Sequence, residues 1–119
     1  MHPLLLCVHM ESAKLMRVSF AAMTLGIQVK EVRKDQWGQT VGALCGLDQE
    51  NPKAPTGTIE EEMLIMAFFP NNLMDAFLKE LRSSGCAVRL KAVLTSHNRA
   101  WPLSFLYQQL LAEAASFQK

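Results

Sequence analysis

The chain has 119 residues, of which 50% are hydrophobic and 19% are charged, and its formal net charge is +1. This length fits one domain, and the composition is too apolar for a disordered protein. A nearly neutral chain has no long-range field that attracts nucleic acid or an anionic membrane surface. No apolar run approaches the roughly 18 residues of a membrane span. We therefore expect one domain, 1–119, with neither nucleic acid nor membrane as a partner.

The cysteines indicate the compartment and argue against a metal centre. Cys7, Cys45 and Cys86 form an odd, widely spaced set without a C-x-x-C pair. That spacing is unlike a disulfide framework and unlike a structural zinc site. We expect a reducing, cytoplasmic protein in which Cys7 is a small buried hydrophobe, with no metal site and no cofactor that the sequence identifies.

The first half of the chain predicts a strand, a helix, a second strand and a short helix. Residues 4–9 are apolar on both faces of a strand, which is typical of a central position in a sheet. Ser12 is expected to cap the helix that follows, and Gly26 to end it in a left-handed conformation. Residues 28–32 carry charges and resemble an edge strand, and residues 41–45 predict one or two helical turns.

The second half predicts the same order of elements. Residues 63–68 are again apolar on both faces, and Asn71 or Asn72 is expected to cap the next helix. Residues 87–94 alternate between apolar and charged side chains, as a strand with one buried face does. Pro102 lacks an N–H group and therefore belongs in the first turn of the last helix.

An internal repeat underlies this similarity. The sequence predicts two units, 4–46 and 63–117, joined by a linker, 47–62, that contains two prolines and a glycine. When the sequence is aligned with itself so that Leu5 falls on Leu64, other identical residues also coincide. They are Gly26 with Gly85, Val29 with Val88 and Leu44 with Leu103.

Two architectures fit this order of elements. We favour an α+β, ferredoxin-like split β-α-β sandwich with strand order 4-1-3-2 and an extra C-terminal helix. The alternative is an α/β, doubly wound parallel sheet of four strands with order 2-1-3-4. A parallel crossover usually carries a well-packed helix. The segment between the second and third strands has only a short helix and a linker, and this favours the ferredoxin-like fold.

A ferredoxin-like sheet has helices on one face, so the other apolar face needs a cover. An exposed apolar face of several hundred Å² is rare in a soluble protein. The last helix, the short helix or a second copy of the chain would each supply the cover. We expect a homodimer or a protein partner that binds through this face.

The densest group of polar and aromatic side chains lies in residues 95–101, after the last strand and before the last helix. Loops at such positions often bind anions and small ligands. We predict a ligand site in which Arg99 binds an anion, His97 provides acid–base chemistry and Trp101 stacks. The predicted site consists of Thr95, His97, Asn98, Arg99 and Trp101. The alternative is a structural loop with Thr95 as a cap, Asn98 closing a turn and Trp101 packed on the helix.

Three other segments are weaker candidates. Residues 35–40 are the counterpart of this loop in the first half, and we expect a turn with Thr40 as the helix cap. His9 falls on Phe68 in the repeat, which predicts a histidine buried in the sheet or in an interface. Residues 60–62 are three successive glutamates, interpreted as a solvated strand entrance.

The segment 90–101 resembles a small, uncharacterised bacterial family, domain of unknown function 3783. The family pattern is close to K-A-x-x-T-x-x-N-x-x-W followed by a helix. The matching positions are Lys91, Ala92, Thr95, Asn98 and Trp101. The resemblance covers roughly residues 63–115 and implies a bacterial cytoplasmic protein, but it brings no activity, cofactor or catalytic residue.

The sequence favours a non-enzymatic regulatory or small-ligand-binding module over two alternatives. One alternative is a small enzyme that binds an anionic substrate with the 95–101 loop. The other is a protein-interaction subunit. None of the sequence motifs known for phosphate-binding loops, dinucleotide binding, serine hydrolases or zinc proteases is present. We therefore name no catalytic residue.

Overall fold

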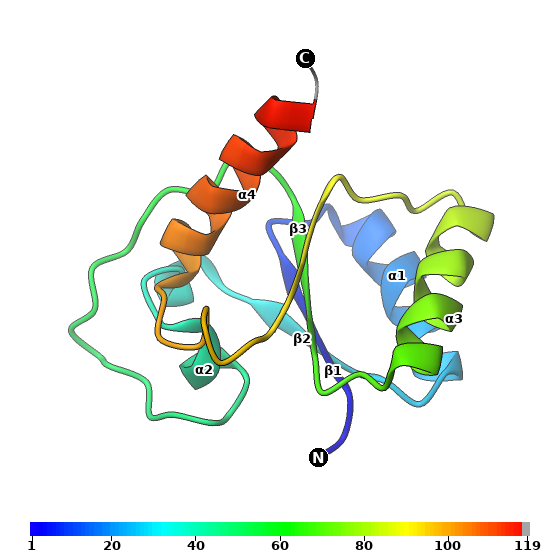
Figure 1. Ribbon diagram of the computed structural model, residues 1–119, viewed down its shortest axis with the longest axis horizontal. Helices are drawn as coiled ribbons and strands as arrows, with labels where there is room; N and C mark the ends of the chain where they lie inside the picture. Colours follow the sequence, from blue (N-terminus) through cyan, green and yellow to red (C-terminus); the bar gives the residue numbers. More distant parts are fainter. Residues whose placement is uncertain (118–119) are drawn as a thin grey trace.

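The computed structural model describes residues 1–117, so the last two residues of the predicted domain, 118–119, lie outside the described part. The described residues form a mixed α+β structure with one open four-stranded sheet and four helices (Figure 1). The elements in chain order are β1 (Leu4–Val8), α1 (Ser12–Thr24), β2 (Gln28–Val32), the short 3-10 turn η1 (Lys34–Gln36), α2 (Val41–Leu44), β3 (Met63–Ala67), α3 (Asn71–Ser83), β4 (Leu90–Val93) and α4 (Leu103–Phe117).

The strand order is β2-β1-β3-β4, and it corrects both predicted topologies. Each outer pair, β1 with β2 and β3 with β4, is parallel, whereas the central pair of β1 and β3 is antiparallel. The ferredoxin-like order 4-1-3-2 is therefore wrong. The doubly wound alternative had the right order but the wrong orientation of the second half.

The connection between β2 and β3 explains this arrangement. Because β3 runs antiparallel to β2, it begins at the edge of the sheet where β2 ends. The connecting chain need not cross the length of the sheet, so no crossover helix is required. This fits a short α2 followed by the proline-containing segment 47–62.

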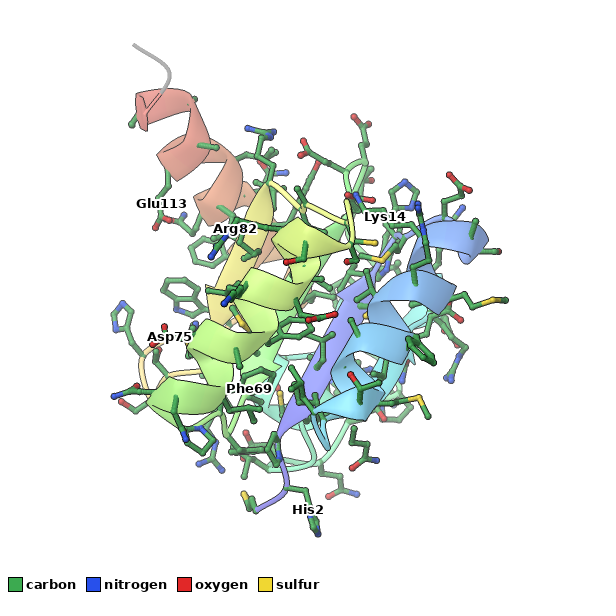
Figure 2. All side chains as sticks on the ribbon, turned by 90° about the vertical axis from the view of Figure 1, so that its right-hand side faces the viewer. His2, Lys14, Phe69, Asp75, Arg82 and Glu113 are labelled. Atoms are coloured by element: carbon green, nitrogen blue, oxygen red, sulfur yellow. The ribbon has the colours of Figure 1, made fainter. Side chains whose placement is uncertain are left out.

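Helices cover both faces of the sheet. Helices α1 and α3 lie on one face, side by side in Figure 2, and α2 and α4 lie on the other (Figure 1). Under α1 and α3 the core contains Leu5, Cys7, Val18, Leu64 and Phe77. On the opposite face it contains Leu6, Val8, Ile65, Leu103 and Leu106.

The covered second face removes the reason for expecting a partner there. Strands β1 and β3 are fully buried, as their apolar sequences predicted. The cover comes from the chain's own α2 and α4, which was one of the predicted possibilities. The argument for a homodimer or a protein partner bound through the sheet face therefore no longer holds.

The two β-α-β units meet symmetrically. Leu6 faces Ile65, its counterpart in the predicted repeat, at the middle of the antiparallel pair. The loops before α2 and α4 are joined in the same reciprocal way. The Val41 N–H donates to the Trp101 carbonyl (2.9 Å), and the Leu103 N–H donates to the Gln39 carbonyl (2.8 Å). An approximate twofold relation thus extends from the sheet to these loops.

The correspondence between the halves shifts at the start of the edge strands, because β4 pairs further along the chain than the repeat predicts. Leu4 pairs with Gln28, but Met63 pairs with Leu90 rather than with Ala87. The predicted strand 87–94 is accordingly shortened to Leu90–Val93. Val88, expected on the same face as Leu90, packs under α1 and α3 instead.

The glycines predicted to end helices were identified better than the residues predicted to cap their beginnings. Gly26 and Gly85 have φ values of 76° and 71°, and they follow α1 and α3 as expected. Ser12 is the first residue of α1 rather than its cap, and no side chain caps that helix. Pro70 occupies the cap position of α3, and α4 begins one residue after Pro102.

Candidate functional site

The two central strands end in residues with left-handed backbone. His9 follows β1 and Phe68 follows β3, with φ values of 53° and 64°. Neither is glycine, so each conformation carries a steric cost. Such costs persist where the surrounding structure enforces them, and they cluster at binding sites. Because the chain turns here, His9 leaves the sheet and is exposed, which corrects the first part of the prediction that it is buried in the sheet or in an interface.

A hollow of about 720 Å³ lies where β1 and β2 end and β3 begins. Its walls are residues 9–11, residues 31–34, Trp37 and residues 60–62, and we call it the first hollow. Ligands of open sheets commonly bind beyond the carboxyl ends of parallel strands. The first hollow occupies that position for the parallel pair of β1 and β2.

Trp37 contributes an unused hydrogen-bond donor to this region. Its side chain is 6% exposed and packs edge-on against the His9 ring, with ring centroids 5.6 Å apart. Within residues 1–117 its indole Nε1 is buried without a hydrogen-bond partner. A buried donor without a partner costs about 1–3 kcal/mol, so a bound acceptor that reaches it stabilises the protein.

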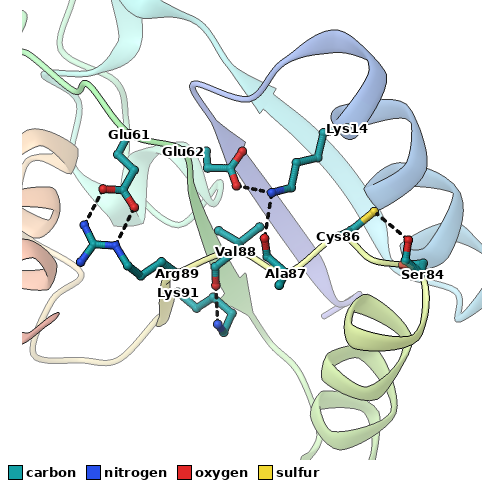
Figure 3. Close-up of polar contacts among 9 residues, drawn as sticks. All are labelled: Lys14, Glu61, Glu62, Ser84, Cys86, Ala87, Val88, Arg89 and Lys91. Atoms are coloured by element: carbon teal, nitrogen blue, oxygen red, sulfur yellow. Dashed lines mark hydrogen bonds and ion pairs between the residues drawn. The ribbon is translucent and has the colours of Figure 1, made fainter. Parts of the chain in front are cut away.

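Two of the five glutamates that line the first hollow are held by cations. Glu62 pairs with Lys14 of α1, which also donates to the Ala87 carbonyl at 2.8 Å (Figure 3). Glu61 accepts two hydrogen bonds from Arg89, with 2.9 Å between Arg89 Nε and Glu61 Oε2. These bonds lower the pKa of the Glu61 carboxyl. The pairs tie the entrance of β3 to α1 and to the segment before β4.

The other three glutamates leave the first hollow negative. Among residues 1–117, Glu11, Glu31 and Glu60 form no ion pair. Of the two cations that line the hollow, Arg33 is paired with Asp35, which leaves Lys34. The three successive glutamates thus contribute to a concave surface and are more than a solvated strand entrance. Such a surface favours positively charged ligands.

The polar groups of Thr95 and Asn98 are used within the predicted 95–101 site. The Thr95 N–H donates to Asn98 Oδ1 at 2.9 Å, and the Asn98 N–H donates to Thr95 Oγ1 at 3.1 Å. Asn98 Nδ2 donates to the Val93 carbonyl, and the side chain is buried. This reciprocal pair closes the turn after β4, as the structural alternative predicted.

Arg99 is held by an acidic partner. Its Nε and Nη2 atoms donate to the two carboxylate oxygens of Asp48, at 2.9 and 2.7 Å. These bonds raise the pKa of the Arg99 guanidinium and lower the pKa of the Asp48 carboxyl. Among residues 1–117 the Nη1 atom of Arg99 has no hydrogen-bond partner. Asp48 therefore fixes the guanidinium and leaves one nitrogen available.

His97 and Trp101 lie together, apart from Arg99. Their ring centroids are 5.1 Å apart, and Trp101 also packs edge-on against Phe105. Both line a hollow of about 350 Å³ beside α4 that Arg99 does not line. The predicted enzyme needed His97 and Arg99 beside one concavity, and the structure does not bring them together.

The counterpart segment 35–40 is a structural turn. Gln39 is buried and forms two hydrogen bonds with the backbone of Asn51, so it fastens the 47–62 linker. Thr40 Oγ1 accepts from the Ala43 N–H and caps α2, as predicted. No local motif indicates the role of Gln39, because it depends on a linker residue 12 positions away.

All three cysteines are buried and free of disulfides, and for Cys7 this confirms the predicted small buried hydrophobe. Burial raises the pKa of the Cys7 thiol to about 12 and that of the Cys45 thiol to about 11. A thiol in this state forms almost no thiolate at neutral pH, and the thiolate is the nucleophile. Neither Cys7 nor Cys45 is suited to nucleophilic catalysis.

Residues 62–117 match the sequence model of the family described as Domain of unknown function (DUF3783). The predicted resemblance to that family is confirmed over this range, which comprises β3, α3, β4 and α4. No curated protein and no solved structure matches the chain.

The described part of the chain contains neither a cluster of metal-ligating side chains nor a helix able to span a membrane. Residues 1–117 contain no group of three or more His, Cys, Asp or Glu side chains placed to hold a metal ion. No helix among these residues has the length and hydrophobicity to cross a membrane.

Proposed function

We propose that the protein is a non-enzymatic module that binds a small organic cation in the first hollow. The observation that carries this proposal is the coincidence of three features beyond the ends of β1 and β2. They are a concave surface with unpaired glutamates, the unused indole N–H of Trp37 and the left-handed backbone of His9. The structural roles of Thr95 and Asn98 speak against the 95–101 loop as the principal site.

The ligand class follows from the groups that line the hollow. Glu11, Glu31 and Glu60 favour an ammonium or similar cation, because hydrogen bonds to charged groups contribute about 1.5–3 kcal/mol. The Trp37 indole donates and therefore requires an acceptor such as a carbonyl oxygen. The ligand thus carries a cationic end and a neutral acceptor.

A binding role without chemistry agrees with the rest of the molecule. His97 and Arg99 line different hollows, so they do not form an acid–base and anion-binding pair. The high pKa values of the Cys7 and Cys45 thiols speak against a cysteine nucleophile.

We also propose that 4–46 and 63–117 are repeated copies of one unit. Two observations support this proposal. Leu6 faces Ile65 in the sheet, and paired hydrogen bonds join the loops before α2 and α4. It explains why the family model covers one half of the chain and why both halves end their first strand in a left-handed residue.

A thermal-shift titration tests the binding proposal. The probe is N-acetylputrescine, which has an ammonium and an amide carbonyl, and the matched neutral compound is N-butylacetamide. A ligand at 100 times its dissociation constant adds about 2.7 kcal/mol to the free energy of unfolding. We expect stabilisation by N-acetylputrescine and about tenfold weaker binding in Glu31→Gln, which removes one carboxylate from the hollow.

Glu113→Gln is the matched control, because Glu113 is exposed on α4 and does not line the first hollow. It makes the same change of charge and is expected to leave the affinity unchanged. Equal stabilisation by both compounds contradicts the cationic ligand class. Equal loss of affinity in Glu31→Gln and Glu113→Gln contradicts the site.

A further inference from the structure

A second hollow, of about 370 Å³, lies at the carboxyl ends of β3 and β4. Because β1 and β3 are antiparallel, these ends lie at the opposite edge of the sheet from the first hollow. The second hollow therefore has the position in the second β-α-β unit that the first hollow has in the first unit.

Corresponding residues line the two hollows. The correspondence follows the sheet pairing. The alignment that places Leu5 on Leu64 applies through the residues that follow the central strands, and the alignment that places Val41 on Leu103 applies from the edge strands onward. The corresponding pairs are His9 with Phe68, Met10 with Phe69, Val32 with Leu94, Arg33 with Thr95, Lys34 with Ser96 and Trp37 with Arg99.

The last of these pairs is also matched in backbone hydrogen bonds. The Gly42 N–H donates to the Arg99 carbonyl, and the Ser104 N–H donates to the Trp37 carbonyl. Arg99 and Trp37 therefore occupy equivalent places in the two units, each beside its own hollow.

The chemistry of the second hollow is the reverse of the first. Its apolar walls come from Leu47, Phe68, Phe69, Val93 and Leu94. The other described residues that line it are Thr95, Ser96 and Arg99, so its lining has no carboxylate and one cation, which is paired with Asp48. Phe69 is fixed from behind by Phe77 of α3, with ring centroids 5.8 Å apart. The apolar part of the wall is therefore held in place by the core.

Arg99 is suited to bind an anion at this position. Asp48 holds two of its nitrogens, which sets the plane of the guanidinium, and the Nη1 atom remains without a partner among residues 1–117. Arginine binds carboxylates well because its planar group offers several donors in a fixed geometry. The Arg99 side chain is 45% exposed, so a ligand from solvent reaches it.

We propose that the second hollow binds a small carboxylate with an apolar body. Arg99 binds the carboxylate and the Phe68–Phe69 wall packs against the body. A hollow of about 370 Å³ lies near the lower end of the size of ligand pockets, which suits a small ligand. The site is separate from the first hollow and takes the opposite charge, so the proposal does not depend on the proposed function.

The probe is 3-phenylpropionate, and 3-phenylpropanamide is its neutral counterpart of nearly the same shape. Binding is measured on the full chain by backbone amide NMR shifts. We expect 3-phenylpropionate to shift the signals of Phe69 and Ser96, and 3-phenylpropanamide to bind at least tenfold more weakly. Equal affinity for the two compounds, or shifts confined to other residues, would overturn the proposal.

A pair of variants at Ser96 tests the site without disturbing Arg99. Ser96 is exposed, and its side chain makes no hydrogen bond among residues 1–117, so substitution leaves the fold intact. Ser96→Asp places a carboxylate in the second hollow and is expected to weaken 3-phenylpropionate binding at least tenfold. Ser96→Asn, of the same size but neutral, is expected to retain affinity within twofold.

Two outcomes separate this proposal from the first hollow. Ser96→Asp is expected to leave N-acetylputrescine binding unchanged, and Glu31→Gln is expected to leave 3-phenylpropionate binding unchanged. An unchanged affinity of Ser96→Asp for 3-phenylpropionate would overturn the second site, whatever happens at the first. Equal weakening in Ser96→Asp and Ser96→Asn would overturn the role of charge there.

Discussion

At the scale of residues, the paired charges determine which candidate groups are available to a ligand. Arg99 and Asp48 form a two-bond pair, and so do Arg89 and Glu61. Their partners are 51 and 28 residues away in the sequence, so the local motif does not reveal them. The 95–101 segment was correctly identified as rich in polar groups. That the segment uses those groups to close a turn could not be predicted, because it depends on side-chain geometry.

The pH dependence of stability follows from these pairs. The hydrogen bonds from Arg99 lower the pKa of Asp48 in the folded protein below its unfolded value. A carboxyl group with a lowered folded pKa contributes stability above its unfolded pKa, about 4, and that contribution disappears as the pH falls through the folded pKa. Asp48→Asn is therefore expected to lose less stability than the parent chain between about pH 5 and pH 2.

Urea denaturation at a series of pH values measures this difference. Asp35→Asn is a suitable control, because Asp35 is exposed and its contact with Arg33 joins neighbours in the chain. An acid sensitivity of Asp48→Asn equal to that of the parent chain would show that the Asp48–Arg99 pair is open in solution.

At the scale of elements, close backbone contacts position the 47–62 linker against the rest of the molecule. Gly38 lies against the carbonyl of Pro55, and a Cβ atom at Gly38 would overlap that oxygen. Gln39 fastens the same linker through Asn51. The linker thus holds a defined path although it contains no helix or strand.

Gly38→Ala is expected to reduce the free energy of unfolding by about 1–3 kcal/mol, because the backbone of the linker must move to admit the methyl group. Chemical denaturation measures the change. Ala54→Gly, in the linker itself, is a control for the general effect of altering a loop residue. A cost below about 0.5 kcal/mol would mean that the linker does not hold this path in solution.

The sequence predicted the elements better than their arrangement. Strands β1 and β3 were identified as central because they are apolar on both faces, and Gly26 and Gly85 marked the ends of α1 and α3. The pairing was not predictable from composition, because all the topologies place apolar strands in the centre and charged strands at the edges.

The first hollow was missed for a similar reason. The parallel pair of β1 and β2 brings His9, Glu31 and Trp37 together, but residues 60–62 join them only because β3 runs antiparallel to β1. Each segment alone has an ordinary structural interpretation, so no local pattern could indicate a shared site.

At the scale of the whole molecule, two β-α-β units share one sheet about an approximate twofold relation, and each has a hollow beyond its strand ends. The relation preserves position but not chemistry. The first hollow contains carboxylates and an unused indole donor, and the second contains apolar side chains and a held arginine.

The indole N–H signals of the two tryptophans report directly on whether the first hollow is the principal ligand site, as we propose. Trp37 lines the first hollow, whereas Trp101 lies beside His97 and α4 and lines neither proposed site. In a titration of the full chain with N-acetylputrescine, we predict a saturable shift of the Trp37 indole signal and no change at Trp101. If neither indole signal shifts, or if Trp101 shifts as much as Trp37, the first hollow is not the principal ligand site.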